Sequence, residues 1–68
     1  MKTEKYIIFK DGTINIFSAN KIHSFMTGGK DVKSAGFWDG KNAYGESSTL
    51  GVKSAKEDTE IIRHFLSK

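Results

Sequence analysis

The amino-terminal part of the chain contains two short runs of mostly apolar residues of the types that favour β-strands. The runs cover residues 6–10 and 13–17, and Asp11-Gly12 lies between them. An Asp-Gly pair between such runs favours a two-residue type I′ turn, because both central residues of that turn adopt positive φ. The pattern therefore predicts a β-hairpin in which Phe9 faces Ile14.

This register divides the side chains of the hairpin between two faces. The expected core face carries Ile7, Phe9, Ile14 and Ile16. The other face carries Tyr6, Ile8, Lys10, Thr13, Asn15 and Phe17. That second face is unusually apolar for a sheet surface that meets water.

A short helix is expected over residues 19–27. Ser18 can cap its first turn, and the two glycines that follow residue 27 can end it. In an α-helix Ile22, Phe25 and Met26 share one face, which we expect to pack on the sheet.

The middle of the chain predicts a second pair of strands. Residues 32–38 form the third strand, although Ser34-Ala35-Gly36 suggests a bulge or a close backbone approach within it. Residues 39–42 form a turn, the fourth strand runs over about residues 42–46, and residues 47–51 are expected to be loop.

The last element is predicted as a helix over residues 55–66. Ser54 and Glu57 have the S-x-x-E spacing of a capping box, and acidic residues follow in the first turns. Its buried stripe is expected to consist of Ile61, Ile62, Phe65 and Leu66.

These elements predict an α+β fold of the two-layer ββαββα type, formed by residues 1–68 as a single domain. Two helices would pack on one face of a four-stranded, mostly antiparallel sheet. The second face of the sheet would stay open.

Composition narrows the function. Eleven basic and eight acidic side chains give a net charge of +3, which does not by itself demand a nucleic-acid partner. The chain has no cysteine, so disulfides, thiolate metal sites and cysteine nucleophiles are excluded. We expect a cytoplasmic protein, because no targeting segment or membrane span is recognisable. A homodimer would supply burial that so short a chain lacks.

No motif indicates catalysis or a bound cofactor. His23 and His64 lack a second ligand at metal-binding spacing, and Gly28-Gly29-Lys30 follows a helix rather than a strand, unlike a phosphate loop. A triad from His64, Asp58 and a serine would need a geometry that nothing in the sequence enforces. We therefore expect no enzyme, no metal and no cofactor.

The open sheet face is the main functional clue, and we expect it to bind a protein partner stoichiometrically. The alternative is a nucleic-acid-binding module that uses the same aromatic and basic face. Either Phe37 or Trp38 must be core. The alternative to an open face is that the chain itself covers Tyr6 and Ile8, for example with the segment 47–52. The candidate partner-binding residues are Tyr6, Ile8, Phe17, Phe37, Trp38, Tyr44, Lys10 and Lys33.

The second half of the chain resembles small uncharacterised proteins of phages and prophages. The resemblance rests on Ser34-Ala35-Gly36-Phe37, residues 43–47, Leu50-Gly51 and residues 54–62. It implies a short accessory protein that docks onto host or phage machinery, a class that includes inhibitors of host defence such as anti-CRISPR proteins. No functional residue is carried over from it.

Overall fold

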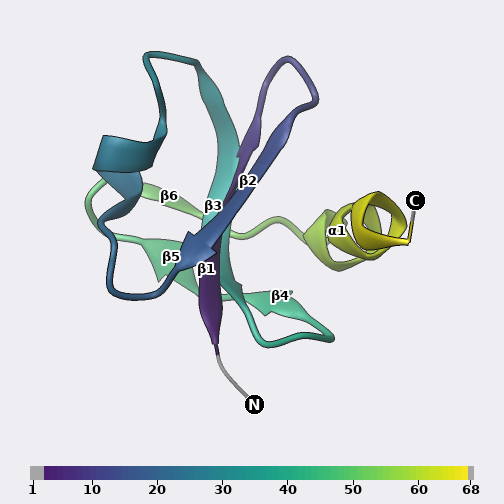
Figure 1. Ribbon diagram of the computed structural model, residues 1–68. Coiled ribbons are helices and arrows are strands. Elements are labelled where there is room, and N and C mark those ends of the chain that lie inside the picture. Colours follow the sequence, from purple (N-terminus) through teal and green to yellow (C-terminus); the bar gives the residue numbers. More distant parts are fainter. Residues whose placement is uncertain (1–2, 68) are drawn as a thin grey trace.

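The computed structural model describes residues 3–67. They form two antiparallel β-sheets, a 3₁₀ turn and a single α-helix (Figure 1). The elements are β1 (Glu4–Phe9), β2 (Ile14–Ser18), the 3₁₀ turn η1 (His23–Met26), β3 (Val32–Trp38), β4 (Ala43–Tyr44), β5 (Glu46–Ser47), β6 (Val52–Lys53) and α1 (Asp58–Leu66). Four strands form an antiparallel sheet in the order β2-β1-β3-β4, and β5 pairs with β6 separately. The predicted α+β class and four-stranded antiparallel sheet are confirmed.

The first hairpin is present, but its predicted turn and register are wrong. Ile8 faces Ile14, one residue away from the predicted pairing of Phe9 with Ile14. The Gly12 N–H donates to the Phe9 carbonyl (3.0 Å), the Phe9 N–H donates to the Thr13 carbonyl (2.9 Å), and Gly12 has φ +91°. This is a three-residue connection that ends in a left-handed glycine, which Asp-Gly suits as well as it suits a type I′ turn.

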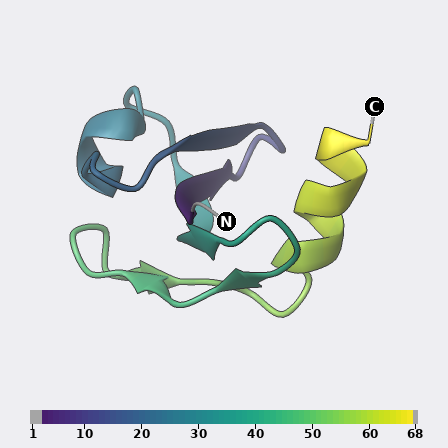
Figure 2. The same ribbon diagram turned by 60° about the horizontal axis from the view of Figure 1, so that its bottom comes forward.

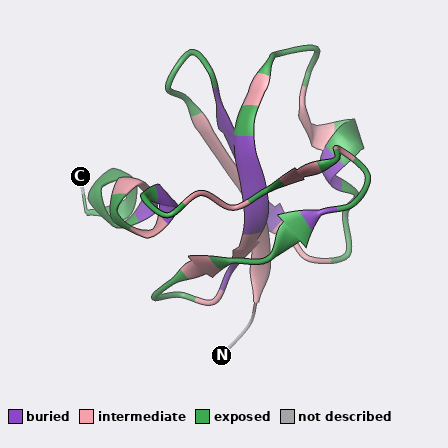
Figure 3. Ribbon diagram, turned by 180° about the vertical axis from the view of Figure 1, so that it is seen from behind, coloured by how far each residue is buried: buried purple, intermediate pink, exposed green. Residues whose placement is uncertain are grey.

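The shift of one residue exchanges the partners of every side chain across the hairpin. Two buried clusters result, one on each face of β1. Figure 3 shows that buried residues are concentrated along the strands in the middle of the sheet. We call core 1 the cluster of Tyr6, Ile8, Trp38 and Ile62. We call core 2 the cluster of Ile7, Phe9, Phe17 and Ala35. The expectation of a single core face and an open second face is therefore wrong.

Different elements cover the two faces. Figures 1 and 2 show α1 on one side of the sheet, with η1 and the β5–β6 hairpin on the other. Core 1 is closed by Ile62 of α1, whereas Met26, Leu50 and Val52 pack against core 2. The chain does cover Tyr6 and Ile8 itself, but through α1 rather than through the segment 47–52.

The predicted first helix is wrong, because only the 3₁₀ turn η1 forms in its place. A 3₁₀ turn has three residues per turn, so residues i and i+3 share a side. His23 and Met26 accordingly face the sheet, where His23 is buried and Met26 packs against core 2. Ile22 and Phe25 face outward, which reverses their predicted burial.

Strand β3 has its predicted bounds, and Gly36 explains its weak centre. A Cβ at Gly36 would collide with the Tyr44 carbonyl oxygen, so the glycine permits a close backbone approach. Gly45, with φ +77°, then separates β4 from β5. The predicted fourth strand is thus divided between β4 and β5, and the β5–β6 hairpin was not predicted, since residues 47–51 were expected to be loop.

Helix α1 begins at Asp58, later than predicted. The predicted cap at Ser54 is not made. Instead the Asp58 carboxylate accepts a hydrogen bond from the Ala55 N–H (2.8 Å), which is the reach-back contact of a capping box displaced by one residue. The same oxygen accepts a hydrogen bond from the Tyr6 hydroxyl (2.6 Å), so this contact connects α1 to β1.

Candidate functional site

The structure disperses the eight predicted partner-binding residues. Those with buried side chains are Tyr6, Ile8, Phe17 and Trp38. Trp38 lies in core 1, so of the pair Phe37 and Trp38 it is the tryptophan that is core. The predicted surface cannot form as described, because covering α1 and η1 leave these side chains no route to a partner.

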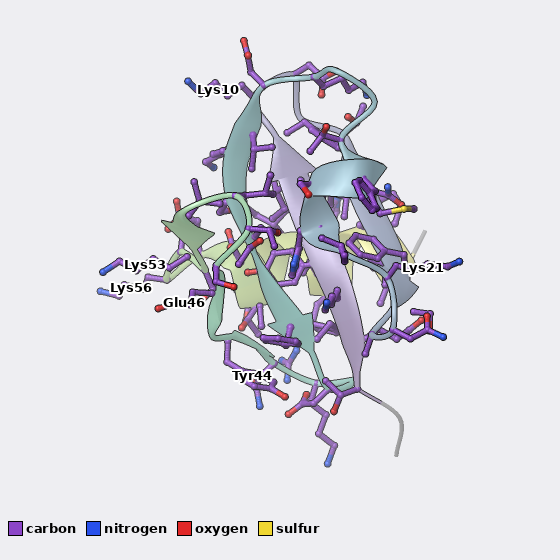
Figure 4. The ribbon with its side chains drawn as sticks, turned by 90° about the vertical axis from the view of Figure 1, so that its left-hand side faces the viewer. Lys10, Lys21, Tyr44, Glu46, Lys53 and Lys56 are labelled. Carbon is purple, nitrogen blue, oxygen red and sulfur yellow. The ribbon has the colours of Figure 1, made fainter. Side chains whose placement is uncertain are left out.

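The other four predicted residues do not make a common surface. Phe37 is half-buried and stacks against Tyr44, with ring centroids 5.8 Å apart. Tyr44 is 45% exposed, and Lys33 lies 3.7 Å from a carboxylate oxygen of Glu57. Figure 4 shows Lys10, Lys21 and Tyr44 at separate margins of the molecule, while Lys53 and Lys56 project together beside Glu46. An aromatic and basic platform for bases is not assembled by these residues.

The large exposed apolar side chains lie elsewhere. Ile22 and Phe25 project from η1 and Phe65 and Leu66 from the end of α1, and all were predicted to be buried. Phe25 is the most exposed of them, at 80%, against 42% for Ile22. The signal that could have found Phe25 is the poor helix propensity of its segment, which contains Asn20, His23 and Ser24.

Phe25 is held in place by contacts on the inner side of η1. The buried His23 ring contacts the Gly36 carbonyl oxygen through Nε2 (3.0 Å) and lies edge-on to Phe17 and Phe37. The Asn15 side-chain amide donates to the Met26 carbonyl (3.0 Å). The turn is therefore fixed to β2 and β3 while Phe25 points to solvent.

Burial also sets the charge state of His23. Removal from water lowers the pKa of this imidazole, and the hydrogen bond to Gly36 opposes the shift only in part. A neutral ring is consistent with its apolar neighbours. His23 thus has a structural role, because its buried ring packs between η1 and strands β2 and β3.

The buried pair of Tyr6 and Asp58 also has a structural role. Burial is the main cause that raises the pKa of the Tyr6 hydroxyl well above its usual value, and the hydrogen bond to the Asp58 carboxylate raises it further. Both side chains are fully buried, so no substrate can reach them in this conformation. The pair connects α1 to β1.

One open hollow lies beside the β5–β6 hairpin. It has a volume of about 570 Å³ and is lined by Lys33, Glu46, Ser47, Ser48, Gly51, Val52 and Lys53. Its lining contains no histidine beside the two serines. Within residues 3–67, no group of three or more His, Cys, Asp or Glu could hold a metal ion. No helix in the described part of the chain is long and apolar enough to cross a membrane.

Comparison with known protein families, curated proteins and solved structures found no match to this chain. We call Ile22 and Phe25, together with the anchored backbone that carries them, the projecting η1 turn. Its selection as the candidate binding site rests on its geometry alone.

Proposed function

We propose that this protein acts without catalysis, by binding a protein partner through the projecting η1 turn. One observation carries the proposal: Phe25 is 80% exposed on a turn whose opposite side is fixed by buried contacts. Full burial of such a side chain contributes about 1.5–3 kcal/mol. Because the turn is already ordered, little conformational entropy would be lost on binding.

Aromatic side chains that enter a partner's pocket commonly dominate the binding energy of protein interfaces. Phe25 would be the anchor and Ile22 its apolar neighbour. Lys21, next to them in sequence and exposed, would favour a partner with acidic groups at the rim of the pocket. A stoichiometric binder of this kind is compatible with the accessory role that the resemblance to phage proteins implies, and that role stays a prediction.

The test is site-specific photo-cross-linking in cells that produce the protein. A photo-reactive phenylalanine analogue at position 25 is expected to capture a discrete protein, and the same analogue at the exposed position 56 is not. With the captured partner purified, Phe25→Ala should weaken binding by at least about tenfold, equivalent to 1.4 kcal/mol. Ser24→Ala, on the same turn, is the matched control and should change affinity little.

Three results would overturn the proposal. They are the capture of no protein at position 25, binding of Phe25→Ala by the captured partner as tightly as the unsubstituted chain, and loss of the association on nuclease treatment. Circular dichroism of each variant establishes that the fold is retained before affinities are compared.

A further inference from the structure

The outer edge of the sheet at β2 carries unpaired backbone groups. The residues of β2 that face Ile7 and Lys5 are Asn15 and Phe17, and the neighbouring Phe9–Thr13 hydrogen bond shows that these positions exchange hydrogen bonds with β1. Hydrogen-bonding direction alternates along an antiparallel strand. The N–H and C=O groups of Ile14 and Ile16 therefore point away from β1, and within residues 3–67 no backbone or side-chain group hydrogen-bonds to them.

This edge lacks the features by which proteins usually prevent strand pairing. Exposed edges are commonly protected by charged side chains, proline or a bulge. The sequence of β2, Ile-Asn-Ile-Phe-Ser, has no charge and no proline, and the register irregularity of the sheet lies between β1 and β3 instead. Figure 2 shows the outer edge of β2 facing away from the β5–β6 hairpin.

We infer that a second copy of this chain pairs with β2, antiparallel and about a twofold axis at Ile16. In this register Ile16 faces Ile16 of the partner subunit, and Ile14 faces Ser18 of the partner subunit. The outward groups of both strands then exchange hydrogen bonds, and the two four-stranded sheets become one sheet of eight strands. The pairing lies apart from the projecting η1 turn and does not depend on the proposed function.

The side chains beside the edge suit a second copy. Directly opposed residues lie on the same face of a sheet, so Ile14 and Ile16 of both copies would form one apolar strip. Both side chains are half-buried at the margin of core 1. Phe65 and Leu66, 42% and 54% exposed, lie at the end of α1 that reaches the level of β2 in Figure 2. The twofold axis would bring the helix ends of both copies to the same apolar strip.

Charge favours the antiparallel arrangement. Asp11 lies at the hairpin end of β2, where its carboxylate is 3.3 Å from Lys30. Lys21 lies beyond the other end, where its carbonyl accepts a hydrogen bond from the Lys5 side chain. Antiparallel pairing places the end with Asp11 beside the partner's end with Lys21, twice by symmetry. Lys10 and Lys30 also lie at the hairpin end, where Asp11 and Asp31 balance their charge, whereas the other end carries Lys5 and Lys21 against the single carboxylate of Glu4. Parallel pairing would place the two more basic ends together.

The experiment measures mass and amide exchange on the same samples of the intact chain. Light scattering behind size exclusion, from millimolar to micromolar loading, is expected to show a monomer–dimer equilibrium. Amide exchange at Ile14 and Ile16 should slow as the dimer forms, whereas the amides of Asn15 and Phe17 should be protected in both states. Ile16→Pro removes an outward donor at an edge position that tolerates proline, and it should weaken the dimer at least about tenfold.

A second variant keeps the inference decidable if Ile16→Pro fails to fold. Leu66→Lys alters an exposed position, brings like charges together across the axis, and should also weaken the dimer, while Phe25→Ala should leave it intact. A monomer at every concentration would overturn the inference, as would a dimer in which Ile14 and Ile16 still exchange freely. Protection of these amides only when a different protein is added would assign the edge to that protein and also overturn it.

Discussion

The two faces of β1 are closed in opposite ways. Core 1 is covered by one element, α1, which contributes a single fully buried apolar side chain, Ile62, and a buried carboxylate, Asp58. Core 2 is covered by residues from η1 and from the β5–β6 hairpin, and Met26, Leu50 and Val52 are each only partly buried. The contacts that cover core 1 therefore come from one element, whereas those that cover core 2 are distributed over two.

The difference shows how a short chain can bury both faces of a strand with a single helix. Core 1 is covered by neighbouring residues of one helix, Ile61 and Ile62, whereas core 2 is covered by contacts from two separate segments, η1 and the β5–β6 hairpin. Deleting one contact should cost most where the covering depends on one residue.

The largest expected effect follows substitution of Ile62. Ile62→Ala removes the one fully buried apolar side chain that α1 contributes to core 1, where Ile61 is only partly buried, and should lower the free energy of unfolding by about 2–5 kcal/mol. Val52→Ala, on the half-exposed margin of core 2, should cost clearly less. Urea denaturation of both variants measures the comparison, and Ile62→Val, at about 0.5–1.5 kcal/mol, replaces Ile62→Ala if the latter does not fold. Equal losses at positions 62 and 52 would show that the two faces are not closed differently.

An intermediate effect is expected for the polar tie of α1. Tyr6→Phe removes the hydroxyl that donates to Asp58 (2.6 Å) and leaves the buried carboxylate with fewer partners. Such a loss costs about 1–3 kcal/mol. Tyr44→Phe is the matched control, because Tyr44 is 45% exposed, and it should change stability by less than about 0.5 kcal/mol. If both variants unfold at the same urea concentration, the hydrogen bond to Asp58 does not stabilise the fold.

The smallest expected effect concerns pH and core 2. The pKa of His23 is lower in the folded chain than its ordinary value of 6.5, so the unfolded chain binds the proton more readily. Stability should be complete above pH 6.5 and should decline as the pH falls below that value. The pKa of Asp11 is about 2, and its stabilisation is lost only between its ordinary value of 3.8 and that value, so the two groups titrate in separate ranges.

Thermal denaturation from pH 7.5 to 4.5 checks this expectation, with His23→Gln as the comparison. The variant should lose the decline that begins below pH 6.5, even if its stability at neutral pH is lower. An unchanged pH profile in His23→Gln would show that another group is responsible.

The sequence was sufficient for elements with strong local signals. The first hairpin, the bounds of β3 and the presence of a carboxyl-terminal helix were all predictable, because turn residues and hydrophobic spacing determine them locally. The register of the hairpin was not. Asp-Gly fits two connection lengths, and both faces of the strands are apolar, so neither the turn nor the pattern could select the pairing.

The exposure of individual side chains was less predictable than the fold, because it depends on the register of the first hairpin and on the type of helix at η1. Tyr6 and Ile8 were assigned to an exposed face through the wrong register, and Phe25 to a buried one through an α-helical period. The buried contacts of His23 with Phe17 and Phe37 favour a tighter turn over the weak helix propensity of the segment. Long-range packing of this kind leaves no local signal in one sequence.

The tie between Tyr6 and Asp58 also has a consequence for synthesis of the protein. The two residues are separated by 52 positions, and Ile62 follows Asp58 along the chain. A ribosome adds about 5–20 residues each second, so Tyr6 and Ile8 spend seconds without their covering helix. Throughout that interval the face of the nascent β1 that carries Tyr6 and Ile8 lacks its covering helix, whereas Met26, Leu50 and Val52, which cover the other face, are made earlier than α1.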